Sequence, residues 1–410
     1  MPSANYRSLL RTPGAAAFFL PASLGRVGIA MTGLSIVWLV HSRTGTFAAA
    51  GLVGGGFAVT DALVAPQLAR LVDRFGQTRV LPPALLAHAL AVAVLVSLVA
   101  ADASDALMTL GGALVGASLP QLSAMSAARW AALLRTDRAA ELPTAFALES
   151  IGNAVAYLVG PVLVSALAAA GHPAVGTVLA ASLSVAGGLV LAAQRGSAPP
   201  PAADSAVHAG AGRSLLCGAV FVLMGLNLAL GVFFGAMQVS VTAFAVEHGA
   251  PGAAAVVFTV SSCSGLLAGW VYGSRRWGAT PPVQLLAATS VLLLGTLLLP
   301  TAGSPFGLGL VVLLTGATIQ PLLVLFSVLT ESTVHRAVLT QAFSWLGSAS
   351  AAGSAAAAAV SGWAIDSAGA RGGFAVTTAA AAAMTLQSLA GLRLLRTGKG
   401  QPARAEPTAN

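Results

Sequence analysis

The sequence predicts an all-α integral membrane protein with twelve transmembrane helices, arranged as two six-helix bundles related by a pseudo-two-fold axis along the membrane normal. Three observations support this prediction. Of the 410 residues, 57% are hydrophobic and only 8% are charged, whereas a soluble domain carries about 25% charged residues. The apolar residues form twelve runs, each near the roughly 20 residues that a helix needs to cross a bilayer. A Pro-, Ala- and Gly-rich segment separates these runs into two sets of six.

The predicted spans follow one another with short connections. In the first half they cover approximately residues 14–40, 47–69, 80–101, 106–128, 143–170 and 173–194. In the second half they cover approximately residues 214–245, 251–273, 281–300, 306–329, 338–365 and 372–392. The first run follows Arg7 and Arg11 as the core of a secretory signal would, but it is too long for one, and no clear small-residue cleavage site precedes Arg26. We therefore expect the first run to remain as a transmembrane helix.

The basic residues lie mostly on one side of the predicted membrane. If the N-terminus is on the inner side, 17 of the 20 Lys and Arg residues lie on that side, whereas Arg43 and Arg371 lie outside and Arg26 lies within the first span. This bias is the positive-inside signal of membrane topology. We expect a multi-pass protein of the plasma (inner) membrane with both termini in the cytoplasm. We attribute the net charge of +8 to topology and expect no nucleic-acid partner.

The stretch from residue 195 to residue 213 is the only long polar interruption, and it follows the sixth span. We expect a six-helix bundle over residues 1–194, a cytoplasmic linker over residues 195–213, a second six-helix bundle over residues 214–396 and a disordered cytoplasmic tail over residues 397–410.

The two halves resemble each other in sequence. Residues 116–122 in span 4, Gly-Ala-Ser-Leu-Pro-Gln-Leu, correspond to residues 316–322 in span 10, Gly-Ala-Thr-Ile-Gln-Pro-Leu, at an offset of 200. At the same offset, residues 69–73 at the inner end of span 2 correspond to residues 269–273 at the inner end of span 8. Halves with six spans each and the same orientation are related by an axis along the membrane normal, with a crevice between them. This is the architecture of a transporter that moves two bundles around a central site.

The most specific motif lies between spans 2 and 3 and reads Ala69-Arg70-Leu71-Val72-Asp73-Arg74-Phe75-Gly76-Gln77-Thr78-Arg79. It resembles the Gly-x-Leu-Ala-Asp-Arg-x-Gly-Arg-Arg loop of the major facilitator superfamily. In that family the loop is a conformational latch, in which the Asp caps a helix of the opposite half. The alternative is a solvated charged turn that only follows the positive-inside rule. By resemblance, the gating role falls to Asp73, Arg74, Gly76 and Arg79. In the equivalent loop of the second half Gly273 stands where the Asp would be, so a second latch is not expected.

Span 5 carries Gly152, Gly160 and Pro161, which resemble the Gly-Pro motif of proton-coupled drug exporters in this superfamily. The resemblance implies an exporter of the drug:proton antiporter type. Ala156 replaces one expected Gly, and the Arg that these exporters carry near the middle of span 4 is missing, because Arg129 lies at the inner end of that span. Small residues in membrane helices also allow close helix packing without any transport role.

Arg26 and Asp61 are ionisable residues at membrane depth, where such residues usually mark a pathway or a pair. Arg26 lies roughly 18 Å from the inner end of span 1, and Asp61 lies roughly 14 Å from the inner end of span 2. We therefore expect the two side chains to pair. Either the pair separates during transport and Asp61 then takes up a proton, or the pair is permanent and fixes helix packing.

Glu149, Asn153 and Tyr157 recur at four-residue intervals in span 5 and therefore share one helix face. This face either lines a cavity or forms a hydrogen-bonded seam with a neighbouring helix. Glu149 could also pair with Arg129, which would make it a structural residue.

The second half has amides, and no full charge, at mid-span. Gln320 beside Pro321 is expected to break span 10 near the cavity. Amides suit hydrogen bonding to a neutral or cationic substrate more than binding of an anion. The expected substrate-cavity residues are Gln121, Asn153, Tyr157, Asn227, Gln238 and Gln320.

The sequence contains no phosphate-binding loop, metal-ligand spacing or nucleophile motif, so we expect neither an enzyme nor a cofactor or metal. We predict a monomeric secondary transporter in the lipid bilayer that exports a small amphiphilic compound in exchange for protons. Asp61 and Glu149 are the candidate proton carriers, and Arg26 is their partner. The alternative is a proton symporter or an uncoupled facilitator that imports a small metabolite. A non-transporting sensor and an intramembrane enzyme are the least favoured interpretations.

Overall fold

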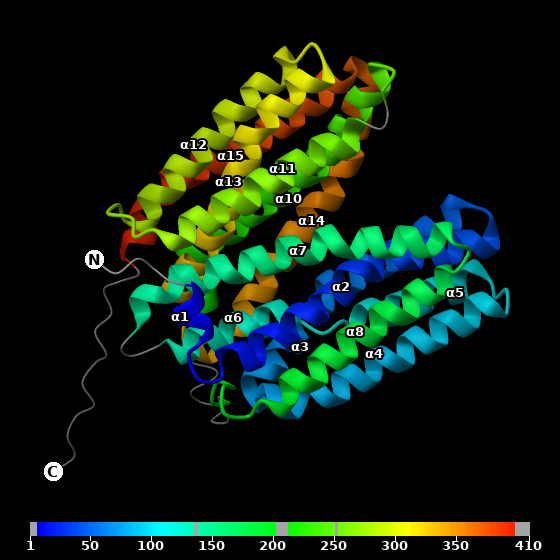
Figure 1. Cartoon of the computed structure of the whole chain (residues 1–410), viewed down its shortest axis with the longest axis horizontal. Helices are drawn as coiled ribbons and strands as arrows, with labels where there is room; N and C mark the ends of the chain where they lie inside the picture. The colour runs from blue at the N-terminus through cyan, green and yellow to red at the C-terminus, as the bar shows by residue number, and fades with distance from the viewer. Residues whose placement is uncertain (1–5, 135–137, 202–211, 251–252, 398–410) are drawn as a thin grey trace.

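The computed structural model describes residues 6–134, 138–201, 212–250 and 253–397, and within these ranges the regular elements are all helices (Figure 1). Eleven helical segments there are long and apolar enough to cross a membrane. A further helix of 30 residues, α14 (Leu339–Ala368), is rich in Ser and Gly and completes the twelve. The predicted all-α, twelve-span fold is thereby confirmed. Residues 202–211 of the predicted linker and 398–410 of the predicted tail lie outside the described residues.

The first bundle consists of α2 to α8, preceded by the short helix α1, and the second consists of α10 to α15. The first-half helices are α1 (Tyr6–Leu10), α2 (Ala15–Thr44), α3 (Phe47–Phe75), α4 (Gln77–Ala100), α5 (Asp105–Ala117), α6 (Leu122–Leu133), η1 (Ala139–Glu141), α7 (Leu142–Ala169) and α8 (Pro173–Ala193). The second-half helices are η2 (Arg213–Leu216), α10 (Gly218–Glu247), α11 (Ala253–Ser274), α12 (Pro281–Leu298), η3 (Leu299–Thr301), α13 (Pro305–Thr333), η4 (Arg336–Val338), α14 and α15 (Ala370–Thr397).

The two bundles meet at one end of the molecule and diverge toward the other (Figure 1). The end at which they meet carries α1, the junction between α3 and α4 and the beginning of the linker; we call it the inner end. In the first bundle α2 packs against α8 and α3 against α5, and in the second α10 packs against α14 and α11 against α13. Between the bundles α3 packs against α14, and α7 packs against α11 and α13. A site between the bundles is therefore built mainly from these interface helices.

Glycines allow the helices inside each bundle to approach closely. Gly231 on α10 faces the backbone carbonyl of Ser350 on α14, and Gly116 on α5 faces the carbonyl of Phe57 on α3. A Cβ atom at either glycine would collide with that backbone. Because lipid tails are as apolar as the side chains, close backbone packing supplies much of the association between membrane helices.

The fourth span is broken into α5 and α6 by residues 118–121. Pro120 has no N–H group to continue a helix, and the Leu122 N–H donates to the Pro120 carbonyl at 3.0 Å. The ring of His88 lies against the end of α5, with Nδ1 3.4 Å from Ser118 Oγ.

The prediction of a break in span 10 is wrong, because α13 runs continuously through Pro321. A proline removes one backbone hydrogen bond, which a packed membrane helix tolerates.

Candidate functional site

A cavity of about 360 Å³ lies between the two bundles. The lining residues of the first bundle come from α2, α3, α7 and the broken fourth span. Those of the second bundle come from α10, α13 and α14. Its polar lining residues are Asp61, Gln121, Ser123, Glu149, Ser150, Asn153, Tyr157, Asn227, Ser327, Ser344 and Ser348. Among the described lining residues the only carboxylates are Asp61 and Glu149, and none is basic.

Two residues that we expected in the cavity lie elsewhere. The Gln320 side chain accepts a hydrogen bond from Ser150 Oγ across the bundle interface, and Gln320 is buried there. Gln238 lies on an exposed part of α10 and does not line the cavity. The expectation failed because the spacing of residues along a helix does not show which neighbour each face meets.

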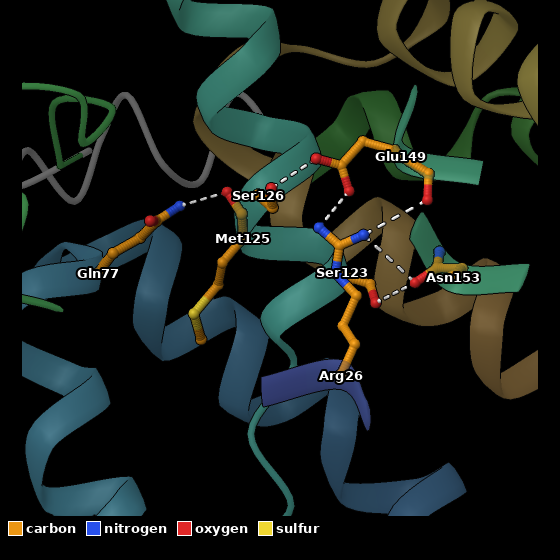
Figure 2. Close-up of polar contacts among 7 residues, drawn as sticks. All are labelled: Arg26, Gln77, Ser123, Met125, Ser126, Glu149 and Asn153. Carbon is orange, nitrogen blue, oxygen red and sulfur yellow. Dashed lines mark hydrogen bonds and ion pairs between the residues drawn. The ribbon is translucent and has the colours of Figure 1, made fainter. Parts of the chain in front are cut away.

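Glu149 is the centre of a buried polar cluster that joins α2, α6 and α7 (Figure 2). Arg26 Nη2 lies 2.5 Å from Glu149 Oε2, and Ser126 Oγ donates to Glu149 Oε1 at 2.5 Å. Arg26 Nη1 also donates to the Glu149 carbonyl at 3.4 Å and to Asn153 Oδ1 at 3.5 Å. Ser123 Oγ donates to the same Asn153 oxygen at 3.0 Å. The cluster is electrically neutral, since it contains one guanidinium and one carboxylate.

The predicted pair between Arg26 and Asp61 is therefore wrong. The two residues have similar depths, but the Arg26 side chain extends from α2 toward α6 and α7 (Figure 2). Asp61, on α3, instead faces the break in the fourth span. Asp61 Oδ1 accepts a hydrogen bond from Gln121 Nε2 at 3.3 Å. Within the described part of the chain, no basic group lies within ion-pair distance of Asp61. Asp61 is thus the uncompensated carboxylate of the cavity.

The suggested pair between Glu149 and Arg129 is also wrong, because Arg129 ties together the inner ends of other helices. Its fully buried guanidinium donates from Nε to Gln77 Oε1 at 2.7 Å and from Nη1 to Ser197 Oγ at 2.7 Å. It also donates to the carbonyls of Gln194 and Leu191, at 2.8 and 2.9 Å. Arg129 thereby fixes the start of the linker beneath the first bundle.

Sequence reasoning missed the part that Gln77 takes in this arrangement. Gln77 accepts from Arg129 and donates from Nε2 to the Met125 carbonyl at 3.1 Å (Figure 2). The sequence did contain a sign of this role, because Gln77 occupies the position of the Arg that directly follows the second Gly of the superfamily motif. An arginine there would face the buried Arg129, so the neutral amide is the compatible residue.

Among the described residues, four first-half side chains form polar contacts that close the inner end between the bundles, and we call these contacts the inner gate. Asp73 Oδ2 accepts from the Gln341 backbone N–H, in the first turn of α14, at 2.9 Å. Thr144 Oγ1 donates to the Gly273 carbonyl at 2.8 Å. The Tyr6 hydroxyl lies within donor distance of the carbonyls of Trp270 and Gly269, at 3.1 and 3.3 Å. The fourth side chain is Ser150, which donates to Gln320. Burial raises the pKa of Tyr6 to about 12, so its hydroxyl remains a donor at neutral pH.

The other residues of the loop motif take different positions. Gly76 has φ of 92°, a conformation that side chains rarely adopt, and this lets α4 begin directly after α3. The side chains of Arg74 and Arg79 are exposed, and the Arg74 guanidinium carbon lies 5.0 Å from the centre of the Phe75 ring. Of the four expected gating residues, Asp73 is the one that contacts the second bundle.

The structure explains the glycine at position 273. A Cβ atom there would collide with the Tyr6 hydroxyl and with the Ala147 methyl group on α7. Gly273 therefore allows α11 and α7 to touch at the inner end, and a side chain at this position, an aspartate included, would separate them.

The second bundle contributes two serines that sequence reasoning missed. Ser344 and Ser348 are one turn apart on α14 and line the cavity, and their buried hydroxyls have no hydrogen-bond partner among the described residues. Their four-residue spacing was a signal, but the many serines and alanines of this helix obscured it. Asn227 on α10 also lines the cavity and donates from Nδ2 to the Leu223 carbonyl at 2.9 Å.

The family model described as "Major Facilitator Superfamily" matches residues 18–340 of the chain. Comparison with the curated proteins gives no match. Among solved structures, the human organic anion transporter MFSD10 is similar with a TM-score of 0.68 and 16% identity, over 91% of this chain and 98% of that one.

Two further solved structures are similar over nearly their whole lengths. A bacterial homologue of the iron transporter ferroportin, in an outward-facing state, has a TM-score of 0.69 and 11% identity over 95% of this chain and 100% of that one. The transporter FucP, in the outward conformation, has a TM-score of 0.70 and 16% identity over 91% and 97%. At these identities the similarity shows the fold alone.

Proposed function

The chain belongs to the major facilitator superfamily and is a multi-pass, non-enzymatic membrane transporter, and on this premise we propose that it exports a small amphiphilic compound in exchange for protons by alternating access. The proposal treats the protein as a monomer in the plasma membrane, with its arginine-rich inner end and both termini in the cytoplasm. In this orientation the inner gate closes the cytoplasmic side, so the conformation is the one that is open to the outside.

The observation that carries the proposal is the contrast between the two carboxylates of the cavity. Glu149 is neutralised by Arg26 at 2.5 Å, whereas Asp61 accepts only a hydrogen bond from the neutral amide of Gln121, at 3.3 Å, among the described side chains. An ionised carboxylate without a basic partner is costly at membrane depth, and a bound proton removes that cost. We therefore assign the proton to Asp61 and a structural role to the pair of Arg26 and Glu149.

The transport cycle follows from this assignment. Asp61 takes a proton from the outside in the present conformation, the inner gate then opens, and the proton leaves to the cytoplasm as the compound binds. The loaded cavity reopens to the outside and releases the compound. Asp73 is the gating residue, because its bond to the first turn of α14 must break before the inner ends of α3 and α14 can separate.

The test uses inside-out vesicles with an acidic interior and a fluorescent pH probe. Compounds from a panel of antibiotics, dyes and metabolites are added outside, and dequenching of the probe reports proton release. We expect at least one compound to cause dequenching in the wild type and in Asp366→Asn, which removes a carboxylate from an exposed position on α14, but not in Asp61→Asn.

Two results would contradict the proposal. If labelled compounds cross the membrane without proton movement, the protein is an uncoupled facilitator. If protons and compound move in the same direction, it is a symporter, the activity that the fucose:proton symporter FucP carries in its name.

A further inference from the structure

We propose that the exported compound is a small organic amine, whose ammonium group pairs with Asp61 and whose other end forms hydrogen bonds with Ser344 and Ser348. This inference rests on the proposed function and names its substrate class. It depends on three observations: the charge of the cavity, the broken fourth span, and the unpaired hydroxyls of α14.

The charge of the cavity favours a single positive charge on the ligand. Its described lining contains two carboxylates and no basic residue. One of the two, Glu149, is already neutralised by Arg26, which is not itself among the lining residues. One negative charge, that of Asp61, is left. An anion would be repelled, and a neutral compound would leave Asp61 ionised and unpaired in the occupied cavity.

The break in the fourth span places hydrogen-bond acceptors next to Asp61. Leu119 and Gln121 lie between α5 and α6 and line the cavity. The Leu119 carbonyl is outside both helices, and it accepts from Gln121 Nε2 at 3.3 Å. The same amide donates to Asp61, so an ammonium group can replace it as donor to both the carboxylate and the carbonyl. Unwound backbone carbonyls of this kind bind cations in transporters with discontinuous helices.

An aromatic ring and a helix end add to this cation site. Tyr157 on α7 also lines the cavity. Aromatic faces attract ammonium groups. The C-terminal end of α5, which is the negative end of its dipole, is directed at the break.

Helix α14, on the second-bundle side of the cavity, supplies hydroxyl groups that have no hydrogen-bond partner among the described residues. Ser344 is only 3% exposed, and neither its hydroxyl nor that of Ser348 has a partner in the described structure. The hydroxyl of the neighbouring Ser327, in contrast, donates to the Leu323 carbonyl of its own helix at 3.0 Å. Buried unpaired hydroxyls are unfavourable, so a ligand with a polar group at this end restores the missing hydrogen bonds.

A ligand that reaches both sites connects the two bundles, which is what a substrate must do to affect their relative movement. The cavity of about 360 Å³ lies near the small end of the usual range of about 300–1,000 Å³ for ligand pockets. The compound is therefore a compact amine and not a large multi-ring drug.

A proton and an amine compete for Asp61 in this arrangement, which explains an exchange of one for the other. The other titratable groups of the described lining are Glu149 and Tyr157, both on α7, and Glu149 is held by Arg26 from α2. The lining residues from α6, α10, α13 and α14 carry no titratable group. Amine binding is therefore expected to weaken as the pH falls, with one proton released for each amine bound.

The test measures binding to purified full-length protein in detergent, without any gradient. The probes are arylalkyl amines with isosteric alcohols and carboxylates, including tyramine, phenethylamine, phenethyl alcohol and phenylpropionate. We expect amines to bind at least tenfold more tightly than their matched alcohols and carboxylates. Asp61→Asn should abolish this preference, and Asp61→Glu and Asp366→Asn should retain it.

The serine site has its own comparison. In the double variant Ser344→Ala/Ser348→Ala, tyramine should bind about fivefold more weakly, while phenethylamine, which lacks the distal hydroxyl, should bind unchanged. Ser182→Ala on the peripheral helix α8, where the hydroxyl bonds to its own helix, should change neither affinity.

Several outcomes would overturn the inference. It is wrong if alcohols or carboxylates bind as tightly as the amines, if Asp61→Asn keeps the preference, or if sodium ions alone displace the bound amines. In the vesicle assay, proton movement driven only by neutral or anionic compounds would show that the amine site is wrong, while the proposal of proton-coupled export would still stand. Asp61-dependent amine binding without proton movement would show that proton-coupled export is wrong, while the amine site would still stand.

Discussion

Arg26 on α2 and Glu149 on α7 form an ion pair in which Nη2 and Oε2 are 2.5 Å apart and both residues are less than 10% exposed. Removing one partner of such a pair leaves an uncompensated buried charge, which costs about 3–5 kcal/mol. We expect Arg26→Leu to lower the free energy of unfolding by about this amount, measured by SDS unfolding in mixed micelles.

The double variant Arg26→Leu/Glu149→Gln should recover most of that loss, because no charge is left and the introduced amide can still accept from Ser126. The exposed Arg43→Leu is the control for loss of a positive charge. If the double variant is as unstable as Arg26→Leu, the cost does not arise from the unpaired carboxylate.

Asp73→Asn is expected to weaken the inner gate. The side-chain amide of Asn has one acceptor oxygen where the carboxyl group of Asp73 has two, and one hydrogen bond contributes about 0.5–1.5 kcal/mol. The substitution should therefore favour the open inner end by about 1 kcal/mol, roughly a fivefold change in population. Spin labels at Arg70 and Ser332, both exposed near the inner end, would show a larger fraction of long distances. An unchanged distance distribution, equal to that of Asp366→Asn, would show that Asp73 does not hold the gate closed.

Gly273→Ala should also open the inner end, but for a steric reason. The added methyl group collides with Ala147 and the Tyr6 hydroxyl only while α11 and α7 are in contact. The same label pair should therefore report opening. Gly278→Ala is the matched control, since nothing lies within 4 Å of a Cβ atom at that position. Identical behaviour of the two variants would mean that the contact at Gly273 does not limit the movement.

Arg129→Met should free the start of the linker. The substitution leaves Gln77 and the carbonyls of Leu191 and Gln194 without their donor. Each unpaired buried acceptor costs about 1–3 kcal/mol. We expect trypsin to cleave after the exposed Arg195 at least about tenfold faster, since local opening by about 1.4 kcal/mol already gives that factor. Cleavage at the wild-type rate would indicate that other contacts hold the linker.

The spans could be predicted from the sequence because the bilayer demands a fixed apolar length and because basic residues mark one side. The partner of Arg26 could not, because depth along a helix does not specify direction around it. Arg26 and Asp61 match in depth, yet one side chain extends toward α7 and the other faces Gln121.

The position of the helix break was also beyond sequence reasoning. Pro120 and Pro321 lie in corresponding segments, but only the first interrupts its helix. The ring of His88 lies against Ser118 at the end of α5, and Ala288 occupies the corresponding position in the second half. A break at membrane depth requires a neighbour that satisfies the freed polar groups, and this neighbour comes from another helix.

The neutral cluster around Glu149 has a consequence for the synthesis of the protein. Its members, Arg26, Ser123, Ser126, Glu149 and Asn153, all belong to the first bundle. The ribosome therefore delivers every partner of the buried guanidinium to the membrane before α10 emerges, and N-terminal units generally fold first. The second bundle, which adds only amides and hydroxyls to the polar lining, inserts beside a half whose cluster is already neutral. The order of translation and the order of charge neutralisation thus coincide.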